Sequence, residues 1–185
     1  MAVRPPDPPL SDGVVTLRPW GEAGDVEAIT AACNDRAIAE FLDQIPSPYT
    51  EDDARAYLES CRVGWRQGAM TNFAIVEAGI PVGSIGVRWL EGLDAGTAEV
   101  GYWMAPEARG RGLCTSALRL ASGWVLQEQG AQRLQLRADE RNVASNKVAQ
   151  NAGFTREGVL RSSRYNARLG RRVDFVMYSL LPTEL

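Results

Sequence analysis

The chain has 185 residues, and its 20 Lys and Arg against 23 Asp and Glu give a formal net charge of −3. Apolar residues make up 45% and charged residues 23%, which is a globular composition and excludes a disordered chain. Histidine is absent, which excludes catalytic triads, Cys–His pairs and imidazole-built zinc sites. The three cysteines, Cys33, Cys61 and Cys114, form no CxxC pair. We therefore expect no disulfide framework, no metal site and a reduced, cytoplasmic setting.

The small net charge conceals two segments of opposite sign. Residues 1–108 carry 7 basic and 17 acidic side chains, whereas residues 109–172 carry 13 basic and 4 acidic ones. A basic second half favours an anionic partner there, and an acidic first half favours a cationic one. The alternative is that two surfaces of opposite sign help the halves of the chain to pack. Charge alone leaves both interpretations open.

The chain is predicted to form a single domain over residues 13–185, preceded by a flexible tail over residues 1–12. The tail contains four prolines and no apolar run, so it does not read as a signal peptide. The rest of the chain has no run of 18 apolar residues, so no membrane-spanning helix is predicted.

The elements of the first half follow from alternation and helical spacing. A strand is expected over 14–18, ended by Pro19. Asp25 is expected to cap a first helix, and residues 36–42 continue in similar style. A further helix begins with Thr50, followed three residues later by Asp53, in the manner of a capping box.

From residue 72 the apolar period changes to two, which predicts an antiparallel meander. Its three strands are expected over 72–77, 82–89 and 97–104. After them we expect a long helix 113–129, strand 133–138, helix 144–151 and strands 155–160 and 173–181. The order βααβββαβαββ predicts an α/β (α+β) domain with a mixed sheet.

The strongest local signal is the segment 104–118, where a strand ends, a basic loop follows and a helix begins. Gly110 and Gly112 let the backbone approach a ligand closely. The N–H groups of the loop and of the helix start can point at an anion, and Thr115 and Ser116 add hydroxyl donors. The segment matches neither a Walker loop nor a GxGxxG dinucleotide motif. The alternative is a simple strand-to-helix turn whose arginines lie in solvent.

This loop resembles a motif of the GNAT (GCN5-related) N-acetyltransferase superfamily. The motif Q/R-x-x-G-x-G/A, which clamps the pyrophosphate of acetyl-coenzyme A, is matched at five of six positions by Arg109, Gly110, Arg111, Gly112, Leu113 and Cys114, where Cys114 replaces the usual Gly or Ala. Segments 15–19, 98–103, 142–148 and 152–158 resemble the RimJ/RimL branch, the ribosomal-protein N-terminal acetyltransferases. The resemblance spans about residues 14–181.

The resemblance implies a fold, a cofactor and a set of contacts. The fold is a mixed, mostly antiparallel twisted sheet of about seven strands, flanked by four or more helices, with two splayed central strands that hold the pantetheine arm of acetyl-CoA. Backbone groups near Tyr102, Trp103 and Met104 are expected to pair with the pantetheine. Backbone N–H groups from Arg109 to Thr115 would hold the pyrophosphate. Asn142 and Asn146 would bind the pantetheine or frame its exit.

Without histidine, proton chemistry falls to carboxylates, hydroxyls or water. Glu99 is the candidate general base, because alternation places it on one face with Gly101 and Trp103 beside the expected gap; the alternative is an ion pair or a structural hydrogen bond. Many family members carry a tyrosine that acts as general acid at the position of Ala149. The branch resemblance implies instead that Ser145 serves the leaving thiolate, the alternative being a serine that caps its helix.

Tyr165 is a second candidate for this acid role, with ordinary packing as its alternative. Cys114 invites a nucleophilic reading, but no histidine can act as its base, so it is expected to fill a small-residue position near the cofactor.

The predicted function is acetyl-CoA-dependent transfer of an acetyl group to a primary amine by direct attack in a ternary complex, with no metal. The acceptor-side helices are acidic, which favours a basic protein N-terminus or a small cationic amine, although a solvated helix face explains the same residues. These residues are Asp25, Glu27, Asp35, Glu40, Asp43, Glu51, Asp52, Asp53 and Glu59. The alternatives are a non-catalytic coenzyme-A-binding module and a nucleic-acid binder that uses the basic segment. Family members are commonly dimers, so a homodimer is an expectation.

Overall fold

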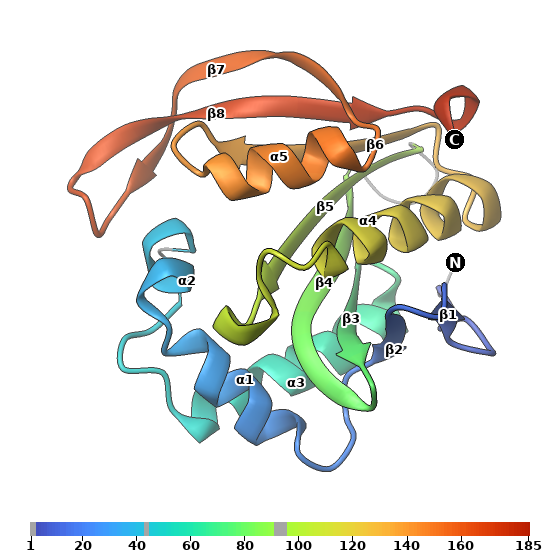
Figure 1. Ribbon diagram of the computed structural model, residues 1–185, viewed down its shortest axis with the longest axis vertical. Helices are drawn as coiled ribbons and strands as arrows, with labels where there is room; N and C mark the ends of the chain where they lie inside the picture. The colour runs from blue at the N-terminus through green and yellow to red at the C-terminus, as the bar shows by residue number, and fades with distance from the viewer. Residues whose placement is uncertain (1–2, 43–44, 91–95) are drawn as a thin grey trace.

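The computed structural model describes residues 3–42, 45–90 and 96–185. A twisted eight-stranded sheet forms its centre, in the order β1-β2-β3-β4-β5-β6-β8-β7 (Figure 1). The strands are β1 (Leu10–Ser11), β2 (Thr16–Pro19), β3 (Met70–Glu77), β4 (Ile80–Leu90), β5 (Thr97–Met104), β6 (Arg133–Asp139), β7 (Thr155–Asn166) and β8 (Arg171–Leu180). Neighbouring strands are antiparallel except β5 and β6, which are parallel. The expected mixed, mostly antiparallel α/β sheet is therefore confirmed.

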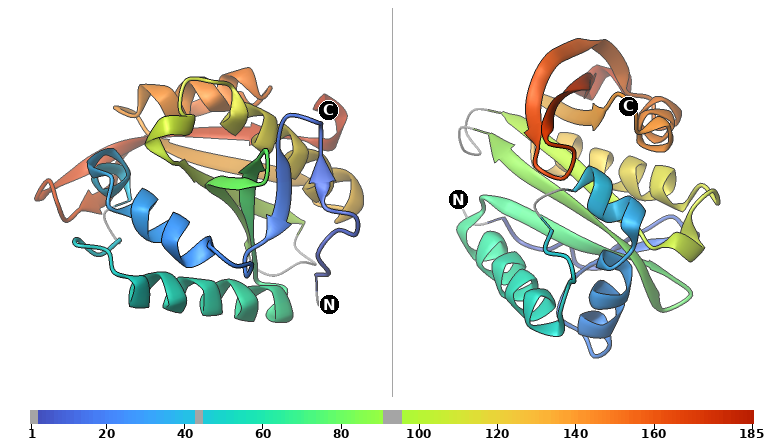
Figure 2. Two further views of the ribbon diagram at one scale, coloured as in Figure 1. Left: turned by 60° about the horizontal axis from the view of Figure 1, so that its bottom comes forward. Right: turned by 90° about the vertical axis from the view of Figure 1, so that its left-hand side faces the viewer.

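Helices cover both faces of this sheet (Figure 2). α1 (Asp25–Cys33) and α3 (Glu51–Gln67) pack on one face against β4 and β3, while α4 (Leu113–Gly123) and α5 (Val143–Asn151) pack on the other. The short helix α2 (Arg36–Phe41) lies beyond the edge of these layers, near the β7–β8 hairpin (Figure 1). The capping box predicted for α3 is present, with Thr50 and Asp53 each accepting the other's backbone N–H.

The N-terminal segment differs from the expected tail at two places. Leu10 and Ser11 pair with β2 as an eighth strand, and the side chain of Val3 is buried in the main core. The reason is apolar burial: both Val3 and Leu10 lie against the core, and the prolines between them are compatible with an extended path.

Three further sequence predictions are corrected. Gly24, not Asp25, is the N-cap of α1; Asp25 is instead fully buried, where it accepts two hydrogen bonds from Arg18 at 2.7 and 2.9 Å. The predicted helix 113–129 is α-helical only to Gly123 and continues as a π-helical turn over Trp124–Glu128. β7 extends to Asn166, six residues beyond its predicted end, because pairing with β8 resumes at Arg164 after a register shift that follows Leu160.

Aromatic side chains tie the two helical layers together. Trp65 of α3 and Trp124 each meet Phe73 of β3 edge-to-face, with ring centroids 5.1 and 5.3 Å apart. Each such pair adds about 1 kcal/mol beyond simple area burial. The same core contains Val100 of β5 and Leu113, Ala117 and Leu118 of α4, so it fixes the start of α4 relative to β5.

Candidate active site

The two parallel central strands pair only where they begin. Thr97, Ala98 and Glu99 of β5 face Arg133, Leu134 and Gln135 of β6, and from there β6 keeps only its antiparallel partner β8. Within the described residues, the segment 101–104 of β5 has no strand partner on the β6 side. Figure 1 shows the two strands diverging toward their C-terminal ends. Backbone donors and acceptors along this edge of β5 are therefore available to a ligand.

The loop after β5 presents an open helix N-terminus. Gly110 and Gly112 have φ of +73° and +81°, a left-handed conformation that glycine adopts without strain. Gly112 is the N-cap of α4 and no side chain caps this helix end. Ser116 donates its N–H to the carbonyl of Gly112 at 3.1 Å, so helix geometry leaves the N–H groups of Leu113, Cys114 and Thr115 without an acceptor in the helix. The loop and helix start together present backbone N–H groups in an arrangement that favours an anion.

The arginine side chains of this loop are engaged in protein contacts. Arg109 donates from Nη2 to Asp35 at 2.6 Å and from Nε to the carbonyl of Met104 at 3.1 Å. Arg111 forms a two-bonded ion pair with Glu77 at 2.8 and 2.7 Å. Both arginines thus hold the loop against neighbouring elements, and the anion site depends on the backbone.

The hydroxyls at the start of α4 differ in their contacts. The hydroxyl of Ser116 donates to Asp12, which ties the N-terminal segment to α4. Thr115 is half-buried beside it. The thiol of Cys114 is half-buried, and burial raises its pKa to about 12. A thiol held neutral in this way supports the expectation of a packing role rather than a nucleophile.

α2 spans the wide end of the opening between β5 and β6. Its N-cap, Asp35, binds Arg109 just after β5. Its Glu40 lies 3.5 Å from Arg141 just after β6, and Arg141 also forms an ion pair with Asp139 at 2.7 Å. The tip of the β7–β8 hairpin packs on the same helix, since Asn166 donates to the carbonyl of Glu40 at 3.1 Å. The opening is therefore bounded by α2 and the hairpin.

Glu99 lies in a network of cationic and polar side chains rather than alone beside the gap. Its carboxylate accepts from Arg137 at 2.7 and 2.9 Å, from Arg88 at 2.8 Å and from Gln135 at 3.1 Å. Burial acts to raise the pKa of Glu99, but the hydrogen bonds and charge of Arg137, with Gln135 and Arg88, outweigh it and lower the pKa. A carboxylate with a lowered pKa is a weak base, so the geometry favours the ion-pair alternative that the sequence left open.

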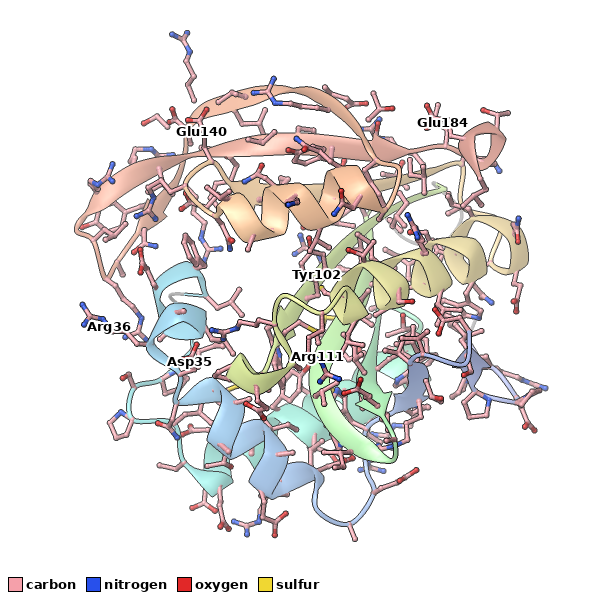
Figure 3. All side chains as sticks on the ribbon, viewed as in Figure 1. Asp35, Arg36, Tyr102, Arg111, Glu140 and Glu184 are labelled. Carbon is pink, nitrogen blue, oxygen red and sulfur yellow. The ribbon has the colours of Figure 1, made fainter. Side chains whose placement is uncertain are left out.

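Ser145 does not cap its helix. Asn142 is the N-cap of α5, and its side-chain oxygen accepts the backbone N–H of Ser145 at 3.0 Å. The hydroxyl of Ser145 instead lies 3.1 Å from the hydroxyl of Tyr102, which also donates to the carbonyl of Ser145 at 3.1 Å. Tyr102 therefore bridges β5 and α5 across the opening, and Figure 3 shows it where β5 passes between α4 and α5.

Tyr102 was predicted only as a backbone contact, and its side chain is the functional group that sequence reasoning missed. Alternation along β5 was the available signal: it places Tyr102 on the α4–α5 face, opposite to Glu99 and Trp103. Trp103 packs on the other face, stacked on Trp20 with ring centroids 6.3 Å apart. Burial raises the pKa of Tyr102 above its ordinary value, so its hydroxyl stays protonated.

Asn146 is occupied by protein partners. Its amide nitrogen donates to the carbonyls of Asp139 and Asn142 at 2.9 and 2.8 Å, and its oxygen accepts from the hydroxyl of Tyr178 at 2.9 Å. These contacts, like the cap formed by Asn142, fix the start of α5 through bonds within the protein. Ala149 is fully buried in the core.

Tyr165 is 55% exposed on β7, and none of the contacts found among the described residues brings it to Ser145 or Glu99. No group of three or more His, Cys, Asp or Glu in the described segments could hold a metal ion. None of the helices described is long and apolar enough to cross a membrane.

Most of the acidic residues of α1–α3 have a hydrogen-bond or ion-pair partner within the protein. Asp25 binds Arg18, Asp35 binds Arg109, and Asp53 accepts the N–H of Thr50. On α3 the further ion pairs are Arg55 with Glu51 and Asp52, and Arg62 with Glu59. Asp43, counted in the same acidic set, lies outside the described residues. Among the described residues, these pairings favour the alternative of a solvated helix face for most members of the set.

A splayed pair of parallel strands beside an uncapped helix N-terminus can accommodate an extended ligand that carries a phosphate, and the hydroxyls of Tyr102 and Ser145 lie across the opening. Comparison with known proteins agrees. Residues 15–155 match the Acetyltransferase (GNAT) domain family, and the chain belongs to this family of acetyltransferases.

Individual relatives point to the same branch as the sequence motifs. The chain is 32% identical over 155 residues to "Putative ribosomal N-acetyltransferase YdaF" of Bacillus subtilis (strain 168), covering 82% of this chain and 81% of that protein. It is 28% identical over 116 residues to the ribosomal-protein-serine acetyltransferase of Escherichia coli (strain K12), covering 63% and 64%. The structure of RimL, a ribosomal L7/L12 alpha-N-protein acetyltransferase in complex with coenzyme A, superposes with a TM-score of 0.83 at 22% identity, covering 94% and 96%. The family and RimJ/RimL-like branch inferred from the sequence are confirmed.

Proposed function

We propose that the protein transfers an acetyl group from acetyl-CoA to the α-amino group of a protein N-terminus. The observation that carries the proposal is the opening between β5 and β6: an unpaired strand edge, an uncapped helix N-terminus and the hydroxyl of Ser145 all border it. Two relatives, named "Putative ribosomal N-acetyltransferase YdaF" and "Ribosomal-protein-serine acetyltransferase", support a protein as the acceptor.

The residues present fit acetyl-CoA. The N–H groups from Gly110 to Thr115 would hold its pyrophosphate, because phosphate oxygens favour the positive end of a helix dipole and free backbone donors. The backbone of residues 101–104 would pair with the pantetheine amides along the open edge of β5. The small glycines keep this surface free of side chains, and nothing lies within 4 Å of a Cβ built at Gly110 or Gly112.

Acetyl-CoA supplies an acetyl thioester, and the chain supplies binding and hydrogen bonds. Ser145 would donate its O–H to the departing sulfur, which stabilises negative charge where it develops. Water is the simplest acceptor for the proton lost by the amine, because the carboxylate of Glu99 is held by two arginines. All these groups belong to one chain, so the proposal requires no second copy. The three free thiols suit the reducing cytoplasm.

The charge around the opening bears on the acceptor. Residues 155–172, which form most of the β7–β8 hairpin, contain six arginines and one acidic residue. Arg161 and Arg171 are exposed and have no carboxylate within ion-pair distance among the described residues. Since this hairpin borders the opening through Asn166, it favours an acceptor with acidic residues near its free amine.

The non-catalytic alternative was motivated by the missing tyrosine at position 149 and by Cys114. Tyr102 and Ser145 place two hydroxyls in the same region, so the site retains proton donors without that tyrosine. The two proposals separate in a thiol-release assay with a panel of peptides, polyamines and aminoglycosides. The enzyme releases coenzyme A thiol when a peptide with a free α-amine is added; tight binding of acetyl-CoA with no release for any amine favours the non-catalytic module.

A further inference from the structure

We infer that Tyr102 is a positioning residue that directs the hydroxyl proton of Ser145 toward the leaving sulfur; the inference rests on the proposed role of Ser145. Tyr102 reaches Ser145 from a different element, because β5 carries Tyr102 on the face that α5 covers. Its hydroxyl is 3.1 Å from both the carbonyl oxygen and the hydroxyl oxygen of Ser145.

Two hydrogen-bond arrangements are compatible with these distances. The carbonyl oxygen of Ser145 can only accept, so Tyr102 can donate to it and then accept the hydroxyl proton of Ser145. In the other arrangement Tyr102 donates to the hydroxyl oxygen of Ser145, and the proton of Ser145 is free to point into the opening. The two arrangements interconvert by rotation of two O–H bonds, without movement of either helix or strand.

The second arrangement is the one that serves acetyl transfer. The N–C bond forms as the C–S bond breaks, the sulfur leaves with the electron pair, and the proton lost by the amine balances the thiol that is released. Ser145 and Tyr102 keep their own protons and contribute hydrogen bonds only. A hydroxyl that accepts one hydrogen bond becomes a better donor in the next, so Tyr102 strengthens the bond from Ser145 to the charged sulfur.

The surroundings keep Tyr102 ready for this role. Its hydroxyl stays protonated at neutral pH, because burial raises its pKa above the ordinary tyrosine value. The cap that Asn142 forms on the N–H of Ser145 fixes the backbone on which the serine hydroxyl stands. No other side chain in the described residues is within hydrogen-bond distance of the hydroxyl of Ser145.

The chain offers a matched control for a purely structural role. Tyr178 of β8 also reaches α5, where its buried hydroxyl donates to Asn146 at 2.9 Å. Tyr102→Phe and Tyr178→Phe each remove one hydroxyl that binds α5, and only the first removes a partner of Ser145.

The test measures kcat and KM for acetyl-CoA and peptide in Tyr102→Phe, Ser145→Ala, the double variant and Tyr178→Phe, with coenzyme A affinity measured by calorimetry. We expect Tyr102→Phe to lower kcat about tenfold, as the loss of a hydrogen bond that supports a charged group does, with KM nearly unchanged. The double variant should be no slower than Ser145→Ala, because the two residues act as one unit. Tyr178→Phe should keep the wild-type kcat.

Each other outcome overturns the inference. An unchanged kcat in Tyr102→Phe would show that Tyr102 has no role in the reaction. An equal loss of kcat in Tyr178→Phe would show that the role is structural. Additive losses of kcat in the double variant would show that Tyr102 and Ser145 act independently. Failure of the proposed function is distinguishable, because the wild-type protein would then release no thiol with any peptide.

Discussion

Arg137 holds the carboxylate of Glu99 through two hydrogen bonds of 2.7 and 2.9 Å, across the point where β5 and β6 separate. Arg88 reaches the same carboxylate from β4, so Glu99 joins three strands by its side chain. This relationship favours a structural and electrostatic role for Glu99 at the narrow end of the opening, while the hydroxyls of Ser145 and Tyr102 lie farther along it.

Glu99→Gln is therefore expected to lower stability more than it alters proton chemistry. The lowered pKa of Glu99 means that its contribution to the free energy of unfolding is present above the ordinary glutamate pKa of about 4.3 and is lost as pH falls through the folded-state value. Urea unfolding at pH 7 should show a loss of about 1–3 kcal/mol, and the difference from wild type should shrink below pH 4. An activity profile whose rising limb disappears in Glu99→Gln would instead identify Glu99 as the base.

Gly112→Ala is expected to impair coenzyme A binding. A side chain at φ +81° costs about 1–2 kcal/mol, and relief of that strain moves the N–H groups at the start of α4. Gly130→Ala is the matched control, since Gly130 has φ +73° and open space around its Cβ position but lies in the turn before β6. Calorimetry should show weaker coenzyme A binding only for Gly112→Ala. Equal coenzyme A affinity in both variants would show that the N–H groups at the start of α4 do not bind the cofactor.

Cys114 is expected to resist alkylation in the folded protein. With its pKa raised to about 12, the thiolate fraction at pH 8 is roughly a thousandfold below that of a free cysteine. Iodoacetamide labelling followed by mass spectrometry should modify Cys114 rapidly in urea and very slowly in the native state. Labelling of the native protein as fast as in urea would show that the thiol of Cys114 is reactive and would support a nucleophilic role for it.

The arginines of the β7–β8 hairpin are expected to select acceptors by charge. Arg161→Gln combined with Arg171→Gln should raise KM severalfold for a peptide with acidic residues after its N-terminus and leave KM unchanged for a neutral peptide. Added salt should reduce the wild-type preference, because exposed charges are screened. Arg62→Gln, on α3, is the control. A preference for basic peptides in the wild type would contradict this assignment.

Much of the fold was predictable because strong periodicity coincided with real packing. β5 was predicted with its observed ends, since Ala98, Val100 and Met104 alternate toward the core. The pairing of β1 was not predictable, because a two-residue strand has no period of its own. The π-helical turn after Gly123 keeps the apolar pattern of a helix, so the sequence does not distinguish it from one.

The candidate site was predictable in its backbone and less so in its side chains. The glycines of the loop point to an anion site because few other functions need two of them before a helix. Local sequence does not indicate which carboxylate an arginine will meet, so the pairs Arg109–Asp35 and Arg111–Glu77 became visible only in three dimensions. For the same reason Tyr102 and Ser145, 43 residues apart, could not be paired from spacing.

The most direct measurement of the central claim is mass spectrometry of a peptide incubated with the enzyme and isotopically labelled acetyl-CoA. We expect one labelled acetyl group on the α-amine and an equal amount of released thiol, with the rate of both markedly lowered in Ser145→Ala while coenzyme A affinity is retained. Binding of coenzyme A without label on any peptide, or undiminished transfer by Ser145→Ala, would contradict it.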